Sequence, residues 1–386
     1  MLLARFVAWK ASFGNVVTVL EPSCAAAGSR RVPLGPWRTF TTGVAVALAA
    51  VLLVTLVSAA GTQRLGFDFR AAYLPAAEAV RDGNSPYVTD RAVADADWHP
   101  YLYPPQLAIA LIPATTVSAN VAAFVAFVVS LAAVLAALAI TGVRDARCYA
   151  VTIVWAPTWH ALEMANVSAV LALGLALVWR YRDRVPAAGC ALGLTISVKL
   201  FLWPLLGWGL ATRRLRATGL ALAVGFGVTL AAWAAIGFAG LTAYPDLRSE
   251  LGNEVSYSIV AVTESLGYSA TVGDVLTAVV GGLLLGLVLR FGRRGDDVQS
   301  FTCAIAAALA ISPSLWQHYL VLLVVPLALA RPRFSAIWLL PIALWMSPRA
   351  GNGEGFETVL PLLVAAALVT VIVVRPGQTG ATAEVV

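Results

Sequence analysis

The sequence predicts an all-α, polytopic integral membrane protein, and three observations predict this fold class. Hydrophobic residues make up 60% of the 386-residue chain, charged residues make up only 12%, and the mean hydropathy is +0.83. A soluble domain averages about 45–50% apolar and about 25% charged residues. Apolar runs of helical length alternate with short loops rich in arginine, as a chain that crosses a bilayer repeatedly requires.

The net charge of +6 arises mainly from these short loops and not from one basic domain. Such a distribution orients a protein in a lipid bilayer, so we expect the bilayer as a partner and no nucleic acid. The four cysteines are scattered without a Cys-x-x-Cys pair. We therefore expect no disulfide framework, no metal site and no cofactor. No hydrophilic run is long enough for a soluble domain, so one membrane domain is predicted over residues 41–374.

The N-terminal part is predicted to enter the membrane from the cytoplasm. Residues 1–40 carry five basic residues and form a cytoplasmic tail, with a cleaved signal peptide as the alternative. Residues 41–60 form the first span, and residues 61–105 form a first outer loop. The apolar run 106–112 is only about 10 Å long as a helix, too short for a hydrocarbon core of about 30 Å. Residues 118–141 then return to the inner side.

The middle of the chain contains an apolar run whose flanking charges argue against one simple span. Residues 187–210 lie between two arginine clusters, at 180–184 and 213–216. A single span would place one of these clusters outside, against the usual distribution of positive charge. We therefore predict a hairpin of two half-length helices that meet near residues 197–199. Broken helices occur at membrane depth where they are buried in protein or line a cavity.

The second half continues this alternation. Residues 218–238 cross outward, residues 240–267 form a second outer loop, and apolar segments then alternate with basic inner loops as far as residue 374. When the half-length segments are counted as crossings, the total is about twelve transmembrane helices. Both termini are then cytoplasmic, and residues 375–386 form a cytoplasmic C-terminal tail.

The first outer loop holds the leading candidate for chemistry, Asp68. This carboxylate follows the apolar residues Leu65–Phe67 close to the membrane interface, where partial desolvation makes a carboxylate a better base. The alternative is an inert loop carboxylate in solvent, paired with Arg70. Chain position alone favours that alternative.

The residues after Asp68 show the spacing of an amphipathic helix. Apolar residues recur at helical intervals over residues 69–80, opposite charged residues. Pro75 suits the first turn of this helix and Gly83 suits its end. The helix either lies on the membrane surface and roofs a groove for a lipid, or packs against the protein as part of the loop.

The other candidates fall on the same predicted outer side. A lysine within an apolar run costs about 2.5–3.5 kcal/mol on insertion scales, so Lys199 is expected either to meet an anion, such as a lipid phosphate, or to extend to the surface. His318 suits contact with a phosphate, orientation of a carboxylate, or the interface, whereas His160 is expected to be structural. The first outer loop concentrates aromatic residues that suit the membrane interface or a sugar ring: Tyr87, Trp98, Tyr101 and Tyr103.

Short motifs occur in a fixed order along the chain. They are Asp68 with Tyr73, Gly83-Asn-Ser-Pro-Tyr87, Tyr101-Leu-Tyr-Pro-Pro105, Asn166, Lys199 followed by Pro204, Gly252-Asn253-Glu254-Val-Ser256, and Ser312-Pro-Ser-Leu-Trp316-Gln-His318. In this order they resemble glycosyltransferase family 87, membrane enzymes of the GT-C type that use polyprenyl-phosphate sugars. The resemblance covers roughly residues 41–374.

The resemblance implies an inverting hexosyl transfer, usually of mannose from polyprenyl-phosphomannose. The implied acceptor is a glycolipid or lipoglycan on the outer face of the plasma membrane. Asp68 would be the general base, and Lys199 and His318 would contact the donor phosphate. The implied substrate-binding residues are Tyr73, Tyr87, Tyr101, Tyr103, Asn166, Asn253, Glu254 and Trp316.

Two departures and three alternatives remain. The chain has Glu163-Met-Ala-Asn166 where the family pattern has Gly-Gln-x-Asn, and Gln317-His318 where paired histidines are usual. These departures bear on the sugar and the acceptor more than on the reaction class, and an arabinosyl donor is one alternative. A polytopic transporter or lipid flippase without transferase activity is the other, although the chain shows no internal two-fold repeat. A non-catalytic scaffold subunit is a third reading.

Overall fold

We describe the protein from a computed structural model. The structure describes residues 36–60, 65–87, 100–242, 244, 256–348 and 356–374. Every regular element in these ranges is a helix, which confirms the predicted all-α class. The greater part of the predicted N-terminal tail and the whole C-terminal tail lie outside the described residues. Asn253 and Glu254, predicted to bind substrate, lie outside them too.

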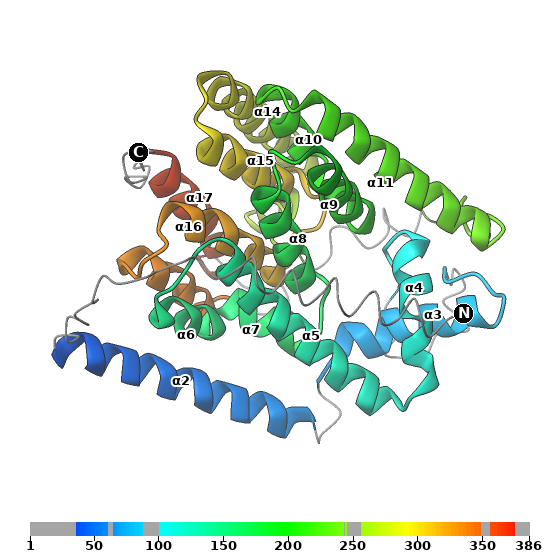
Figure 1. Ribbon diagram of the computed structural model, residues 1–386, viewed down its shortest axis with the longest axis horizontal. Helices are drawn as coiled ribbons and strands as arrows, with labels where there is room; N and C mark the ends of the chain where they lie inside the picture. The colour runs from blue at the N-terminus through cyan, green and yellow to red at the C-terminus, as the bar shows by residue number, and fades with distance from the viewer. Residues whose placement is uncertain are drawn as a thin grey trace, which may run out of the picture. The chain divides into compact units, whose positions relative to one another are not determined.

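The chain forms α-helices joined by short turns and short stretches of 3-10 or π-helix (Figure 1). In chain order they are α2 (Pro36–Ala60), η1 (Phe69–Tyr73), α3 (Leu74–Arg81), α4 (Pro105–Leu111), η2 (Ile112–Thr116), α5 (Ala119–Ile140), α6 (Ala146–Val154), α7 (Ala156–Glu163), α8 (Ser168–Arg180), α9 (Val185–Val198), η3 (Leu200–Leu202), α10 (Pro204–Ala211), α11 (Leu215–Ala235), α13 (Ile259–Ser265), α14 (Ala270–Arg294), α15 (Asp297–Ile311), η4 (Gln317–Leu323), α16 (Val324–Ala330), η5 (Ala336–Met346) and α17 (Phe356–Val374).

Among the described residues, the helices long enough to cross a bilayer are fewer than the predicted spans. Among the described residues, α5, α11, α14 and α17 are long and apolar enough to cross a bilayer. The α7–α8 pair passes the same test as one span that bends by 117°, which raises the total to five. The other apolar helices have 10–17 residues, and most are shorter than a core of about 30 Å requires. The structure therefore supports a helical membrane protein, but not the count of about twelve spans, which included half-length segments.

The predicted hairpin around residues 187–210 is present. Helix α9 ends at Val198, Lys199 adopts an extended conformation, and the chain resumes as η3 and α10. The two ends of the hairpin meet, because Arg214 after α10 lies 3.0 Å from Asp183 before α9. Arg214 also lies 2.8 Å from Asp297 at the start of α15. The arginine-rich connections of α8, α10 and α15 therefore lie at one end of the helices.

Close packing against α11 holds α9, the first helix of the hairpin, in place. A Cβ atom on Gly193 of α9 would lie only 2.6 Å from the carbonyl oxygen of Ala221 in α11. Gly225 of α11 faces the same glycine, with the Gly193 carbonyl oxygen 3.2 Å from where its own Cβ would be. Small residues allow helix backbones to approach closely in a membrane, where packing replaces the hydrophobic effect as the attractive force.

Helix α15 is the central helix of the largest core. All its residues from Ser300 to Leu309 are buried, and it contacts α10, α14, α17 and η4 (Figure 1). A helix that is apolar on every side is expected to be enclosed by other helices. Its buried position fixes the segment that follows it, residues 312–318, at the end of the helix opposite to the Arg214–Asp297 ion pair.

The amphipathic helix predicted in the loop after the first span is α3. It begins with Pro75 in its first turn, and the chain turns at Gly83, whose φ of +78° favours glycine. Its apolar residues Leu74, Ala76 and Ala77 are buried, and α3 contacts α4 and η2. The reading in which this helix packs against the protein is therefore correct, and its apolar face does not lie on the bilayer.

Candidate functional site

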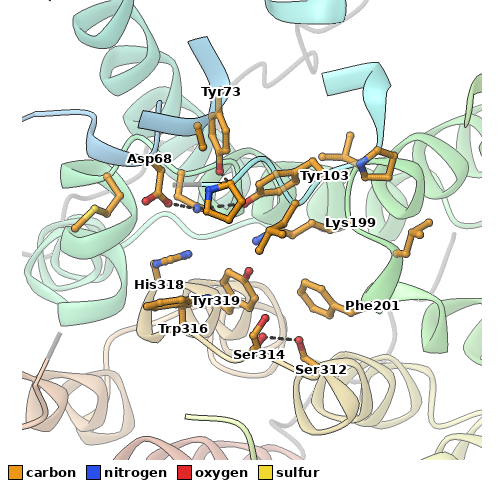
Figure 2. Close-up of a pocket in the computed structure, with 18 of the residues that line it drawn as sticks. Asp68, Tyr73, Tyr103, Lys199, Phe201, Ser312, Ser314, Trp316, His318 and Tyr319 are labelled. Carbon is orange, nitrogen blue, oxygen red and sulfur yellow. Dashed lines mark hydrogen bonds between the residues drawn. The ribbon is translucent and has the colours of Figure 1, made fainter. Parts of the chain in front are cut away.

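A cavity of about 300 Å³ lies where the predicted outer loop meets three helix ends (Figure 2). Its walls come from the segment before η1, the segment before α4, the α7–α8 turn, the break between α9 and η3, and the residues between α15 and η4. Helices α8, α9 and α15 have 13, 14 and 15 residues. Each is therefore about 20 Å long, and together they separate the cavity from the ion pairs around Arg214.

The cavity brings together seven of the residues predicted from the sequence. They are Asp68, Tyr73, Tyr103, Asn166, Lys199, Trp316 and His318. Residues up to 250 positions apart in the chain thus face one space, and Figure 2 shows Asp68, Lys199 and His318 around it. The shared location supports a single site for a ligand with both polar and apolar parts.

Tyr87 and Tyr101 do not line the cavity, in contrast to the prediction that they bind substrate. The Tyr101 hydroxyl donates to the Pro104 carbonyl at 2.9 Å and accepts from the Ala108 amide at 2.9 Å. The Tyr87 hydroxyl donates to the Tyr103 carbonyl, also at 2.9 Å. Both rings are buried, so their role is to hold the segment that presents Tyr103.

Asp68 is placed by a short turn that is anchored to α7. The Gly66 amide donates to the Glu163 carbonyl at 2.7 Å, and the Arg70 side chain donates to the Leu65 carbonyl at 2.8 Å. Gly66 has a φ of +76°, and a Cβ atom there would lie 2.9 Å from the Ala123 Cβ. A larger residue would therefore displace the turn that leads into Asp68.

Asn166 lies in the sharp α7–α8 turn and contacts Asp68 directly. Its Nδ2 donates to Asp68 Oδ2 at 2.5 Å and to the Tyr103 hydroxyl at 3.4 Å. Its Oδ1 accepts from both the backbone amide and the hydroxyl of Ser168, at 2.9 and 2.7 Å. The preceding residue, Ala165, has a φ of +48°, which is unusual for a residue with a Cβ atom.

Two tyrosines line the wall next to Asp68. The Tyr73 hydroxyl donates to the Tyr103 hydroxyl at 2.7 Å. Burial raises the pKa of Tyr73 well above its usual value, and the Asp68 carboxylate raises it further. Burial also raises the pKa of Tyr103. Both phenols therefore stay protonated at physiological pH and act as hydrogen-bonding groups, not as bases.

Lys199 occupies the break between α9 and η3 and is only 6% exposed. Its Nζ lies 3.4 Å from the centroid of the Tyr319 ring, 5.1 Å from that of Tyr103 and 5.8 Å from that of Phe201. It also donates to Ser168 Oγ at 3.5 Å. Aromatic faces attract a cation without neutralising its charge. The amine is thus held at the cavity, where an anion would favour its charged form.

The helix break that exposes Lys199 is stabilised by a side chain from α4. Gln106 Nε2 donates to the Ser197 carbonyl at 2.5 Å and to Thr229 Oγ1 of α11 at 3.3 Å. Ending α9 frees backbone carbonyls, which are costly to leave unpaired away from water. Gln106 directly follows the Tyr-Pro-Pro segment, so the same segment supplies Tyr103 to the cavity and a donor to the broken helix.

His318 shares its wall with two residues that the sequence analysis did not assign to the site. His160, predicted to be structural, lines the cavity, and its ring lies 5.5 Å from that of His318 at 70°. Tyr319, which directly follows His318, lines it as well. The Trp316 ring stacks on His318 at 6.4 Å. The imidazole nitrogens of His318 accept or donate no hydrogen bond within the described part of the chain.

Metal binding has no support in this geometry. Among the described residues, no group of three or more His, Cys, Asp or Glu side chains is placed to hold a metal ion. The cavity instead combines one carboxylate, one ammonium group, two imidazoles and several aromatic rings. Such a set can remove a proton at one point and stabilise negative charge at another.

Comparison with known protein families identifies a match. A family model described as Glycosyltransferase family 87 matches residues 101–315, more than half of the chain. The matched range contains Tyr103, Asn166 and Lys199, whereas Asp68 precedes it and His318 follows it. No curated protein and no solved structure matches the chain.

Proposed function

The chain belongs to glycosyltransferase family 87 and is a membrane glycosyltransferase, and we propose that it transfers mannose from a polyprenyl-phosphate donor. The acceptor in this proposal is a glycolipid or lipoglycan of the cell envelope, and the reaction takes place on the outer face of the plasma membrane. The observation that carries the proposal is the cavity that combines the Asp68 carboxylate with the buried Lys199 ammonium. Transfer of a sugar from a lipid phosphate requires a base for the acceptor hydroxyl and a site that binds the anionic phosphate.

The proposed reaction is a single displacement that inverts the anomeric centre. Asp68 takes the proton of the acceptor hydroxyl as its oxygen attacks the anomeric carbon. The bond between that carbon and the phosphate oxygen breaks, and polyprenyl phosphate leaves with the electron pair. Lys199 stabilises the charge on the departing phosphate as a preorganised positive group, and His318 donates a hydrogen bond to it. Trp316 and Tyr103 present aromatic faces to the sugar.

The position of the cavity supports a lipid-linked donor. It lies about 20 Å along α8, α9 and α15 from the arginine-rich end. Since the hydrocarbon core is about 30 Å thick, a site at that distance is nearer to the opposite membrane interface, where a lipid phosphate resides, than to the interface at the arginine-rich end. In the proposed orientation the arginine-rich end and both termini are cytoplasmic, and the cavity faces outward.

Transfer of label tests this function directly. The full-length protein in lipid nanodiscs is incubated with polyprenyl-phospho-[¹⁴C]mannose and a lipid extract of the source organism. We expect label to move into a glycolipid fraction with the unmodified protein and not with Asp68→Asn. Label that stays in the donor with every extract would overturn the proposal, and profiling the glycolipids of a deletion strain identifies the acceptor.

A transporter or lipid flippase is the second candidate, because two broken helices meet at the cavity. The α7–α8 turn and the α9–η3 break both contribute polar residues there, and such breaks are common at transporter binding sites. Movement of a labelled polyprenyl-phosphate sugar across proteoliposome membranes, without sugar transfer, would favour this candidate.

A further inference from the structure

The α7–α8 turn places two side chains between the two charged groups of the cavity. Asn166 donates to Asp68 Oδ2 at 2.5 Å, and Lys199 Nζ donates to Ser168 Oγ at 3.5 Å. Ser168 Oγ in turn donates to Asn166 Oδ1 at 2.7 Å. A continuous chain of hydrogen bonds therefore runs from the carboxylate to the ammonium group, and its two middle members come from one turn.

We propose that Asn166 and Ser168 are positioning residues: Asn166 orients the Asp68 carboxylate, and Ser168 holds Lys199 at a set place relative to it. This inference rests on the proposed function, because it assigns Asp68 to proton removal and Lys199 to the donor phosphate. It differs from the expectation that Asn166 binds substrate and adds Ser168, which the sequence analysis did not single out.

The hydrogen bonds fix which end of the Asn166 amide faces Asp68. The Ser168 backbone amide is a donor only, and it lies 2.9 Å from Asn166 Oδ1. The amide oxygen must therefore point toward α8, and the amide nitrogen must point toward Asp68. Capping of a helix start by an asparagine side chain is a common source of stability. Here the cap also determines that Asp68 receives a hydrogen bond.

The backbone makes this arrangement rigid. Ala165 adopts a φ of +48°, and the two helices meet at 117°. The Gly66 amide donates to the Glu163 carbonyl at 2.7 Å, which ties the same turn to the segment that carries Asp68. Strained backbone of this kind persists where the surroundings hold it, and it clusters at functional sites. Asp68 and Asn166 are thus fixed relative to each other by both side chains and backbone.

Loss of the Asn166 amide should change how the base responds to pH. A hydrogen bond donated to a carboxylate favours its ionised form. The titratable and charged groups that face Asp68 or share its cavity come from every packed element: Tyr73, Tyr103, His160, Glu163, Lys199, Tyr244, His318 and Tyr319. All of these are unchanged when Asn166 is replaced, so a shift in the pH profile reports on Asn166 itself.

Asn166→Asp is the sharpest variant, because it keeps an oxygen to cap α8 but replaces the donor with a second carboxylate. In the mannose-transfer assay we expect kcat to fall about 100-fold or more, and the acid limb of the kcat profile to move up by at least about one pH unit. Asn166→Ala should also move the acid limb of the kcat profile up, but by a smaller pH difference. The KM for the donor should change little in either variant.

Ser168→Ala tests the other half of the arrangement. In this variant the backbone amide of residue 168 still donates to Asn166 Oδ1, so Asn166 keeps its orientation. The acid limb of the kcat profile should therefore not move. The dissociation constant for polyprenyl phosphate, measured by equilibrium binding without acceptor, should rise about fivefold because Lys199 loses its hydrogen bond. Ser300→Ala is the matched control, since it removes another buried hydroxyl, one that donates to the Val288 carbonyl at 2.8 Å far from the cavity. It should leave both quantities unchanged.

The outcomes separate this inference from the proposed function. If Asn166→Asp and Ser168→Ala lower only the melting temperature, with wild-type pH profile and phosphate binding, both residues are merely structural and the inference is overturned. If the unmodified protein transfers no sugar although it binds polyprenyl phosphate, the proposed function fails. In that case unchanged binding by Ser168→Ala overturns the placement of Lys199 by Ser168 as well.

Discussion

Lys199 Nζ lies 3.4 Å from the centroid of the Tyr319 ring. This distance is well within the range of about 6 Å at which a cation is attracted to an aromatic face. The two residues come from different elements, the α9–η3 break and η4. The Phe201 ring packs against Tyr319 with the two ring centroids 5.4 Å apart and the planes nearly parallel, at 6°, and its centroid lies 5.8 Å from the same Nζ. The aromatic pair therefore forms a fixed surface for a cation in a place where water is scarce.

Tyr319 should contribute to donor binding through its ring and not its hydroxyl. Tyr319→Phe keeps the aromatic face, so the affinity for polyprenyl phosphate should stay within about twofold. Tyr319→Leu removes it, and the affinity should fall about tenfold, because a desolvated cation–π contact contributes about 2 kcal/mol. Equilibrium binding of polyprenyl phosphate measures both. Equal affinities for the two variants would contradict a role for the ring.

Lys199→Met should weaken phosphate binding strongly while preserving the fold. Methionine has a similar length and suits a buried position, but it carries no charge. A hydrogen bond to a charged group contributes about 1.5–3 kcal/mol, so the dissociation constant for polyprenyl phosphate should rise about 10- to 100-fold. Lys199→Arg should not restore it, since the planar guanidinium does not fit a place shaped for an ammonium group. An unchanged dissociation constant would remove Lys199 from the donor site.

Asp68→Asn should abolish sugar transfer and leave donor binding intact or tighter. The amide cannot accept the acceptor proton, and loss of a general base lowers kcat by about 100-fold or more. The matched control is Asp82→Asn in the same loop, because Asp82 is exposed and paired with Arg81 at 2.8 Å. Transfer rates and polyprenyl phosphate binding should be measured for both. Retained activity in Asp68→Asn, with a well-folded protein, would disprove its assignment as the base.

The connection between α5 and α6 should make stability depend on pH. A hydrogen bond from Arg147 is the main cause that lowers the pKa of Asp145 from 3.8 to about 2, and the Phe334 amide adds to it. The ionised form therefore stabilises the fold above about pH 4, and this contribution is lost as the pH falls toward 2. Asp145→Asn should lower stability by no more than about 1 kcal/mol at neutral pH and remove that pH dependence.

Thermal unfolding in detergent between pH 2 and pH 7 measures this effect. Asp183→Asn serves as a control, because the Asp183 side chain is 69% exposed and solvent weakens its pairing with Arg214. An Asp145→Asn variant that loses stability toward pH 2 as steeply as the unmodified protein would contradict the assignment.

Local patterns in the sequence were enough to predict several elements. The hairpin over residues 187–210 followed from the two arginine clusters that flank it, and the structure confirms that its ends meet at Arg214 and Asp183. Pro75 correctly indicated the first turn of α3, and Gly83 correctly indicated its end. The described residues do not support the count of about twelve spans, because hydropathy does not tell a half-length helix enclosed by protein, such as α15, from one that crosses the bilayer.

The candidate site was predictable only in part. Asp68, Lys199 and His318 were singled out as polar residues in unusual places, and they line one cavity. Ser168, His160 and Tyr319 were missed, because a serine at a helix start, a histidine at a turn and a tyrosine in an apolar run are ordinary in sequence. Tyr87 and Tyr101 were assigned to substrate, although their hydroxyls pair with nearby backbone.

The sequence by itself determined the helical membrane class, the break at Lys199 and the order of the motifs, since these depend on composition, charge and spacing along the chain. Only the tertiary structure decided that Asn166 reaches Asp68 across 98 positions and that Tyr319 faces Lys199. The physical reason is that these contacts depend on how separate helices pack and where each one ends. Periodicity within one segment carries no information about the segment that it meets.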